Sequence, residues 1–240
     1  MSAVRANISD EMRQIKIGLL VWALIWIVNK AIVHMTLLAL PSSSFAAVEL
    51  LLKTLNFIVS IVLMVYVIRN WQWDLDDWGF TYDLGFWVAL LVTCVYVGYF
   101  WYMEGLPTDF GTQTIRQALT GIWEELISTV FFTLLLTKYF RTLPRLSTVS
   151  AKTLAVVISA IVFTLIHYGQ WTIGEVLVNT SSFIIYRVVY AFVGTFFVGL
   201  VIHGVSDSHY MAFPLLLAFY GVVAILNWRA RNAKRDSVAG

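Results

Sequence analysis

Two adjacent glutamates, Glu124 and Glu125, stand in an apolar run that is long enough to cross a lipid bilayer. They are the only formally charged residues between Gln117 and Thr137. Placing one carboxylate in hydrocarbon costs about 2.5–3.5 kcal/mol on insertion scales. Two neighbouring carboxylates therefore require a polar or hydrated interior and a partner, which constrains how the surrounding helices assemble.

The rest of the chain is also strongly apolar. Of its 240 residues, 60% are hydrophobic and 12% are charged, and the mean hydropathy is +0.79. Globular proteins carry about 25% charged residues, so this chain has about half the usual means of covering a surface exposed to water. We therefore expect an all-α, polytopic membrane helix bundle. The net charge of +2 is too small to suggest nucleic acid as a partner, and membrane lipids are the expected surroundings.

About eight stretches approach the roughly 20 apolar residues that a transmembrane helix needs. The stretch around Arg187 fits either a pair of spans split near that residue or a broken helix. Because the linkers are short, we predict one transmembrane domain over 17–228, after an interfacial segment at 1–16 and before a basic tail at 229–240. The predicted spans lie near 17–39, 46–68, 84–103, 117–137, 151–169, 174–189, 190–207 and 211–228.

The lysines and arginines predict the orientation of the bundle, because they gather on the cytoplasmic side of membrane proteins. With both termini in the cytoplasm, the basic residues that flank the spans fall on that side. The opposite side then keeps only Arg116. We expect a multi-pass protein of the plasma (inner) membrane with both ends inside.

Five ionisable residues occur at overlapping depths in three different predicted spans: Glu124, Glu125, His167, His203 and Asp207. Glu124 and Glu125 point about 100° apart on a helix, so we expect one to face a cavity and the other to brace a neighbouring group. His203 and Asp207 share a helix face. This pair could be a histidine oriented by a carboxylate, two metal ligands, or two groups that contact one carbonyl.

The remaining charged residues in the spans are predicted to be structural. They lie near the ends of spans or can extend their aliphatic stems toward the surface of the membrane. These residues are Lys30, Glu49, Lys53, Glu175 and Arg187.

Three motifs carry a resemblance to a known family. The sequences EELIST (124–129), FTLIH (163–167) and HGVSD (203–207) follow one another within 121–207. They resemble the EExxxR, FxxxH and HxxxN or HxxxD motifs of the CPBP (Abi) intramembrane proteases, the CAAX protease and bacteriocin-processing family, which includes type II CAAX prenyl endopeptidases. Thr129 stands where the family has arginine, which would lie on the Glu125 side of the helix and could compensate its charge.

The resemblance implies an endopeptidase that acts on a membrane-associated peptide or a lipid-anchored protein, with catalytic groups at all five positions. It assigns Glu124 as the base that activates water, and His167 as a group that helps to hold that water. His203 and Asp207 would face the oxygen of the scissile carbonyl. In a rival mechanism, Glu124, His167, His203 and Asp207 are ligands of Zn²⁺. We place water activation without an obligatory metal slightly above the zinc mechanism, because no HExxH motif is present.

Two functions outside the peptidase class stay open. A non-catalytic family member, such as an immunity or scaffold protein, is favoured by the missing motif arginine at position 129. A proton-coupled transporter is suggested by intramembrane glutamate and histidine, which are common proton-relay groups. The absence of an internal sequence repeat argues against the transporter.

Overall fold

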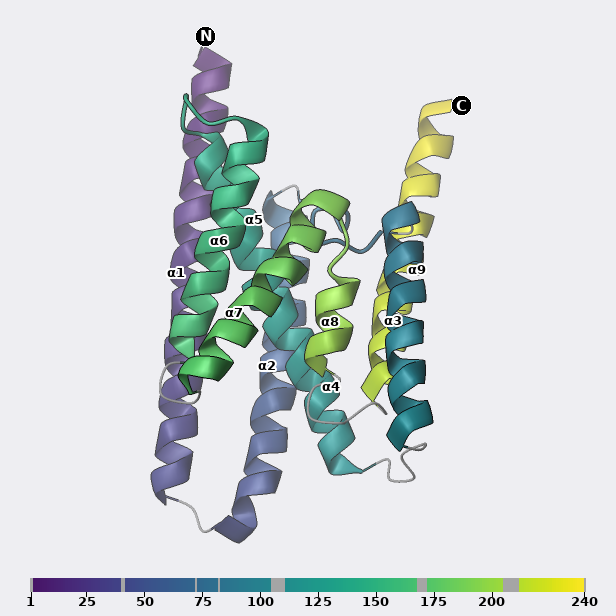
Figure 1. Cartoon of the computed structure of the whole chain (residues 1–240). Helices are drawn as coiled ribbons and strands as arrows, with labels where there is room; N and C mark the ends of the chain where they lie inside the picture. The colour runs from purple at the N-terminus through teal and green to yellow at the C-terminus, as the bar shows by residue number, and fades with distance from the viewer. Residues whose placement is uncertain are drawn as a thin grey trace.

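The structure is a computed structural model that describes residues 2–39, 42–71, 73–81, 83–104, 111–167, 172–204 and 212–239. Every regular element in these ranges is a helix, which confirms the all-α prediction (Figure 1). Two of the elements, η1 and η2, are π-helical. In chain order the elements are α1 (Ser2–Ala39), α2 (Ser42–Trp71), α3 (Leu84–Glu104), α4 (Thr112–Glu124), η1 (Glu125–Phe131), α5 (Phe132–Arg141), α6 (Thr148–Ile166), α7 (Ile173–Val188), η2 (Val189–Val193), α8 (Phe197–Gly204) and α9 (Ala212–Ala239).

Seven helical segments in the described part of the chain are long and apolar enough to cross a membrane. The chain is therefore an integral membrane helix bundle, as predicted. The predicted span at 190–207 is described only as far as residue 204; here η2 extends α7 and the chain then reverses at Gly194. Gly194 adopts a φ of 89°, which a residue without Cβ tolerates best. The helix that follows, α8, has 8 residues, or about 12 Å, against a hydrocarbon core of about 30 Å.

One continuous helical segment, α4–η1–α5, forms the centre of the bundle. Of its most apolar stretch, 83% is buried inside the protein, against 22–33% for the other six spans. Because neighbouring helices cover this segment, it can carry polar side chains that lipid would exclude. Thr133 is one example, since its hydroxyl donates a 2.9 Å hydrogen bond to Ser159 of α6.

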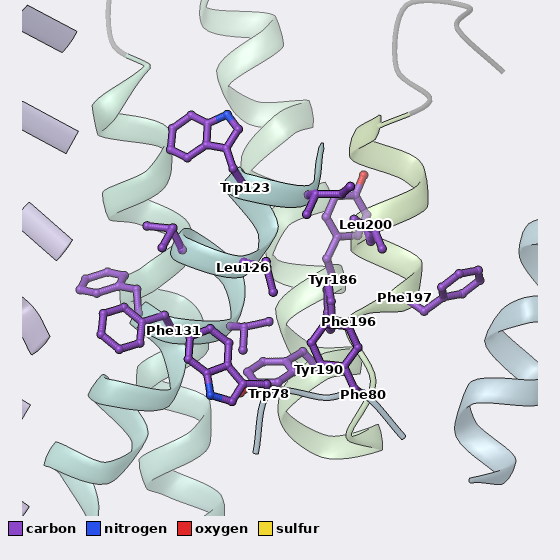
Figure 2. Packing of buried hydrophobic residues seen from close by; sticks show 14 of the residues in the cluster. Trp78, Phe80, Trp123, Leu126, Phe131, Tyr186, Tyr190, Phe196, Phe197 and Leu200 are labelled. Carbon is purple, nitrogen blue, oxygen red and sulfur yellow. The ribbon is translucent and has the colours of Figure 1, made fainter. Parts of the chain in front are cut away.

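The π-helical segment η1 begins directly after Glu124 and is buried along its whole length. π-helical turns are rare and often occur at functional sites. Figure 2 shows Trp123, Leu126 and Phe131 following one another along this part of the central segment. The ring of Trp78 stacks on that of Phe131 with a centroid distance of 5.8 Å, so η1 is held by aromatic packing from outside its own helix.

The loop at 73–81 packs inward, and α9 holds it through hydrogen bonds. Tyr220 donates from its hydroxyl to the carbonyl of Gly79 at 2.7 Å and accepts from the N–H of Thr81 at 3.1 Å. Asn227 donates to the carbonyl of Phe80 at 2.8 Å. Since these partners lie about 140–150 residues apart in sequence, they tie one end of the bundle together.

The beginning of α1 and the end of α9 lie at the same end of the bundle (Figure 1). This arrangement supports the prediction that both termini lie on one side of the membrane. Residues 2–16 continue into the first span as part of the single helix α1. Their assignment as an interfacial segment stays a prediction, as do the domain boundaries at 17–228 and 229–240.

Candidate active site

Glu124 and Glu125 lie at the junction of α4 and η1, in the middle of the buried central segment. Their exposed fractions are 6% and 1%. The two side chains differ in surroundings, as the 100° separation predicted. Glu124 lines a pocket, whereas Glu125 is enclosed and its Oε2 atom has no hydrogen-bond partner in the described part of the chain.

His203 of α8 brings the two glutamates together through its two ring nitrogens. Its Nε2 lies 3.1 Å from Oε2 of Glu124, and its Nδ1 lies 3.0 Å from Oε1 of Glu125. A ring that donates to both carboxylates carries a proton on each nitrogen and is cationic. One imidazole therefore links and partly neutralises two carboxylates that would otherwise repel each other.

Aromatic rings fix the position of this histidine. The centroids of Phe163 and Phe183 lie 6.0 and 6.2 Å from that of His203. These rings come from α6 and α7, and His203 itself comes from α8. The packing of α6, α7 and α8 against the central segment thus determines the position of the His203 imidazole.

His167 caps the C-terminal end of α6, four residues after Phe163. Its Nδ1 lies 2.9 Å from the carbonyl oxygen of Phe163. A carbonyl can only accept, so Nδ1 is the donor and, in the neutral ring, Nε2 presents a lone pair. His167 lines the same pocket as Glu124, which places both predicted groups at one cavity.

This pocket has a volume of about 200 Å³ and lies between α1, α2, the end of α4 and the end of α6. Two lysines line it: Lys30 of α1 and Lys53 of α2. The ammonium nitrogen of Lys53 lies 3.7 Å from Oε1 of Glu124, and its side chain is 22% exposed. Glu49, also in the wall, forms an ion pair with Arg116 of α4. Lys53, which was predicted to be structural, thus lies beside Glu124 at this pocket.

Arg187 lies within a helix and not at a split between two spans, which was one of the two alternatives for this stretch. Helices α7 and η2 form one continuous helix through it, and its side chain is 0% exposed. Its guanidinium carbon lies 5.1 Å from the ring centroid of Phe163 and 5.6 Å from that of Phe183, and Glu125 is a negative charge that acts on it. The buried position of Arg187 follows only from the packing of α7 against the central segment. The sequence alone is compatible with an arginine in a loop or in a buried helix.

The fifth predicted residue, Asp207, lies outside the described residues. Among the described residues, no three or more His, Cys, Asp or Glu side chains are grouped so that they could hold a metal ion. Since the predicted zinc set includes Asp207, that set stays a prediction.

The fold and the site define an integral membrane protein with a glutamate–histidine centre inside a helical bundle. Residues 110–209 match the model of a protein family, described as Rce1-like, type II CAAX prenyl endopeptidase Rce1-like. Over this segment the chain matches the CAAX protease family, as the three motifs predicted. No curated protein and no solved structure matches the chain. The matched segment contains all five predicted site residues, whereas Lys30 and Lys53 lie before it.

Proposed function

We propose that this protein is an intramembrane endopeptidase that hydrolyses a peptide bond in a membrane-associated or lipid-anchored substrate. One observation carries the proposal: Oε2 of Glu124 lies 3.1 Å from Nε2 of His203, and Glu124 lines a pocket together with His167 and Lys53. A carboxylate that is oriented by a histidine and open to a cavity on its other side is suited to act as a general base.

In the proposed reaction, Oε1 of Glu124 removes a proton from a water molecule in the pocket. The water oxygen bonds to the carbonyl carbon of the substrate, and the carbonyl electron pair moves onto its oxygen. When this intermediate collapses, the carbon–nitrogen bond breaks and protonated Glu124 returns its proton to the amine. Glu124 is then a carboxylate again, and the products are an amine and a carboxylic acid, which releases its own proton to solvent.

His167 and Glu125 have supporting roles in this scheme. His167 lines the same pocket as Glu124, so its imidazole is placed to contact the attacking water. Glu125 holds the second nitrogen of His203 and so fixes the ring against Glu124. The family resemblance assigned His203 to the carbonyl oxygen of the substrate; the geometry favours a positioning role, because both ring nitrogens face carboxylates.

The location of the pocket bears on the substrate. Its residues come from the end of α1, the beginning of α2 and the end of α6, away from the termini (Figure 1). With both termini cytoplasmic, the site opens in the outer half of the membrane. A peptide bond has to be released from helical hydrogen bonding to enter such a site, which suits an extended segment near the membrane surface.

The test is hydrolysis of a farnesylated peptide ending in Cys-aliphatic-aliphatic-Xaa by the full chain in liposomes. Glu124→Gln keeps the size of the side chain and should lower kcat by about 10²–10⁴-fold, the usual contribution of a general base. His167→Ala and His203→Ala should also be strongly impaired. If these variants fold and cleave as the parent does, the protein is not a glutamate-dependent peptidase. Full cleavage after exhaustive chelation would exclude the zinc mechanism; loss that Zn²⁺ restores would support it.

The same assay distinguishes the non-catalytic alternative. An immunity or scaffold protein would leave this peptide intact, and Glu124→Gln would then change stability without changing any hydrolysis. The buried Arg187 weakens the main reason for that alternative, because a charge near Glu125 is present even though Thr129 replaces the motif arginine.

A further inference from the structure

A groove runs along the surface of the bundle between α2 and α9, away from the pocket at Glu124. Its volume is about 550 Å³, and apart from Arg69 its walls are apolar. Helix α2 lines it over 57–69 and α9 over 219–226. Both helices belong to membrane spans, and Val62 in the α2 wall is 62% exposed. The groove therefore faces the hydrocarbon of the bilayer.

The two ends of the groove differ in chemistry. Near the middle of the span Ala47–Trp71, the rings of Phe57 and Phe219 meet edge to face with their centroids 6.0 Å apart. The two helices come together there, which closes that end. At the other end is Arg69, in the last turn of α2 and at the end of the bundle that carries both termini (Figure 1). A cation thus stands at the membrane surface, above an apolar channel.

The length of the groove matches one leaflet of the bilayer. About 18 Å of helix separate Phe57 from Arg69, and each leaflet contributes about 15 Å to the hydrocarbon core. The acyl chain of a lipid in that leaflet reaches from the headgroup level to the Phe57–Phe219 ring pair. A helix from a second protein would cross the whole core and extend past the closed end. The groove therefore fits a lipid chain and not a transmembrane helix.

Hydrocarbon in the groove is favourable for a simple reason. An empty groove would leave its lining atoms without contacts on one side, and apolar walls offer water no hydrogen bonds. A chain in the groove contacts α2 and α9 together, whereas a lipid against a single helix face is contacted on one side only. Such a chain is held more firmly than the lipids that surround the rest of the bundle.

Arg69 is placed to bind the phosphate of the same lipid. A guanidinium can donate two parallel hydrogen bonds to a phosphate, and basic groups between helices at the membrane surface attract anionic headgroups. Arg69 is exposed and takes part in none of the ion pairs found among the described residues. Asp76, in the adjoining loop, pairs instead with Arg231 at 3.1 Å and accepts a hydrogen bond from Asn227 at 2.8 Å.

We propose that this groove binds one anionic glycerophospholipid of the phosphatidylglycerol type, with an acyl chain between α2 and α9 and its phosphate on Arg69. The proposal does not rest on the proposed function, because lipid binding involves no reaction at Glu124. It does bear on the candidate active site. Phe57 follows Lys53 by one turn of α2, and Lys53 lines the pocket, so a lipid that braces α2 against α9 also steadies one wall of that pocket.

The test measures lipid binding to the full chain in detergent. Protein stripped of lipid receives phosphatidylglycerol, or phosphatidylcholine with the same acyl chains, whose choline cation offsets the phosphate charge. Native mass spectrometry counts the lipids that stay bound. A phosphatidylglycerol with a photoreactive group on its acyl chain maps the site by cross-linking.

Two positions are changed, each with a matched control. Arg69→Gln removes the cation, Arg69→Lys keeps it, and Ile61→Trp fills the groove. Arg145→Gln is the control for charge, since Arg145 is also exposed but lies between α5 and α6. Val92→Trp is the control for bulk, since Val92 of α3 is 60% exposed and outside the groove. Thermal unfolding checks that each variant is folded.

If the proposal holds, the parent retains one phosphatidylglycerol in preference to phosphatidylcholine. Arg69→Gln lowers the affinity for phosphatidylglycerol at least about fivefold, the usual contribution of one basic residue at a membrane surface, and Arg69→Lys keeps part of it. Ile61→Trp abolishes retention. Cross-links fall within 57–69 and 219–226 and disappear in Ile61→Trp, while both controls behave as the parent.

Other results overturn the proposal. Equal retention of the two lipids by the parent, or unchanged affinity in folded Arg69→Gln, means that Arg69 does not bind the phosphate. Cross-links spread evenly over the lipid-facing helices indicate ordinary bilayer contact, and a dimer that excludes the lipid assigns the groove to a second copy. Should Ile61→Trp not fold, Arg69→Gln decides alone, because its side chain is exposed. None of these results alters the peptide-cleavage assay, so the two proposals fail independently.

Discussion

Arg187 and Glu125 are buried in the same interior, and both retain polar atoms without a hydrogen-bond partner in the described part of the chain. Their exposed fractions are 0% and 1%. The unpartnered atoms are Nε and Nη2 of the arginine and Oε2 of the glutamate. An isolated charge in such an environment is unfavourable, and the negative charge of Glu125 acts on the Arg187 cation.

Replacement of Arg187 by methionine should therefore weaken the site. The change removes the buried cation that acts on Glu125 and keeps an apolar stem of similar length against Phe163 and Phe183. We expect kcat/KM to fall at least about tenfold, equivalent to about 1.4 kcal/mol, together with a lower unfolding temperature. Peptide cleavage in liposomes and thermal unfolding measure the two effects.

A second substitution tests whether charge is the reason. Thr129 lies one helical turn after Glu125, on the same face, and is buried. In a background with Arg187→Ala, which vacates space, Thr129→Arg should restore part of the lost activity. Failure of the double variant to exceed Arg187→Ala, when both fold, would argue that Arg187 acts through packing alone.

Gly199 of α8 is closely packed against the carboxylate of Glu125. A Cβ atom at this position would lie 2.7 Å from Oε2 of Glu125 and 3.1 Å from Cβ of Tyr186. We expect Gly199→Ala to displace the carboxylate from His203 and to lower kcat about tenfold, or about 1.4 kcal/mol. Gly98→Ala in α3 is the control, because its Cβ would meet no atom within 4 Å. A normal rate for Gly199→Ala would mean that the position of Glu125 is not critical.

The hydroxyl of Tyr220 is predicted to stabilise the loop at 73–81 without contributing to catalysis. Tyr220→Phe leaves the carbonyl of Gly79 and the N–H of Thr81 without this partner, at a cost of about 1–3 kcal/mol for buried groups. Unfolding by heat or denaturant should show this loss, with cleavage unchanged in the folded fraction. Tyr66→Phe is the matched control, since Tyr66 is 52% exposed, and it should change stability by less than about 0.5 kcal/mol.

Asp77, in the same loop, should make stability depend on pH. Burial raises the pKa of the Asp77 carboxyl above its ordinary value. A group whose pKa is higher in the folded state stabilises the fold below its unfolded pKa, about 3.9 for aspartate. This stabilisation is lost as pH rises through the folded pKa. Asp77→Asn should remove this part of the pH dependence, so its unfolding temperature should fall less than that of the parent between pH 4 and 7. Identical pH profiles of the two proteins would contradict the assignment.

Much of the bundle could be predicted from the sequence because lipid imposes simple requirements. A span must be apolar over about 20 residues, and a carboxylate within it must face the interior of the protein. These two rules predicted a helical membrane protein in which Glu124 and Glu125 face the interior. The order of the motifs added His167 and His203 to the predicted site. In the structure His203 contacts Glu124, and His167 lines the same pocket as Glu124.

One predicted span, at 190–207, differs in the described residues for a local reason. Apolar composition at 190–207 satisfies the requirement for a span, but the sequence does not specify that the helix continues through Arg187 and reverses at Gly194. The reversal depends on a backbone conformation and on the packing of η2 and α8 against the centre. Composition over a window cannot distinguish one long span from an extended helix that is followed by a short one.

The sequence by itself therefore determined the helical membrane class, the interior position of Glu124 and Glu125, and the set of candidate site residues. The tertiary structure decided which groups meet. It placed one imidazole between two carboxylates, brought Lys53 to Glu124 from a helix outside the matched segment, and enclosed Arg187 behind Phe163 and Phe183. These contacts join residues from different helices, and they depend on how helices rotate and pack, which hydropathy and motif spacing along one chain do not encode.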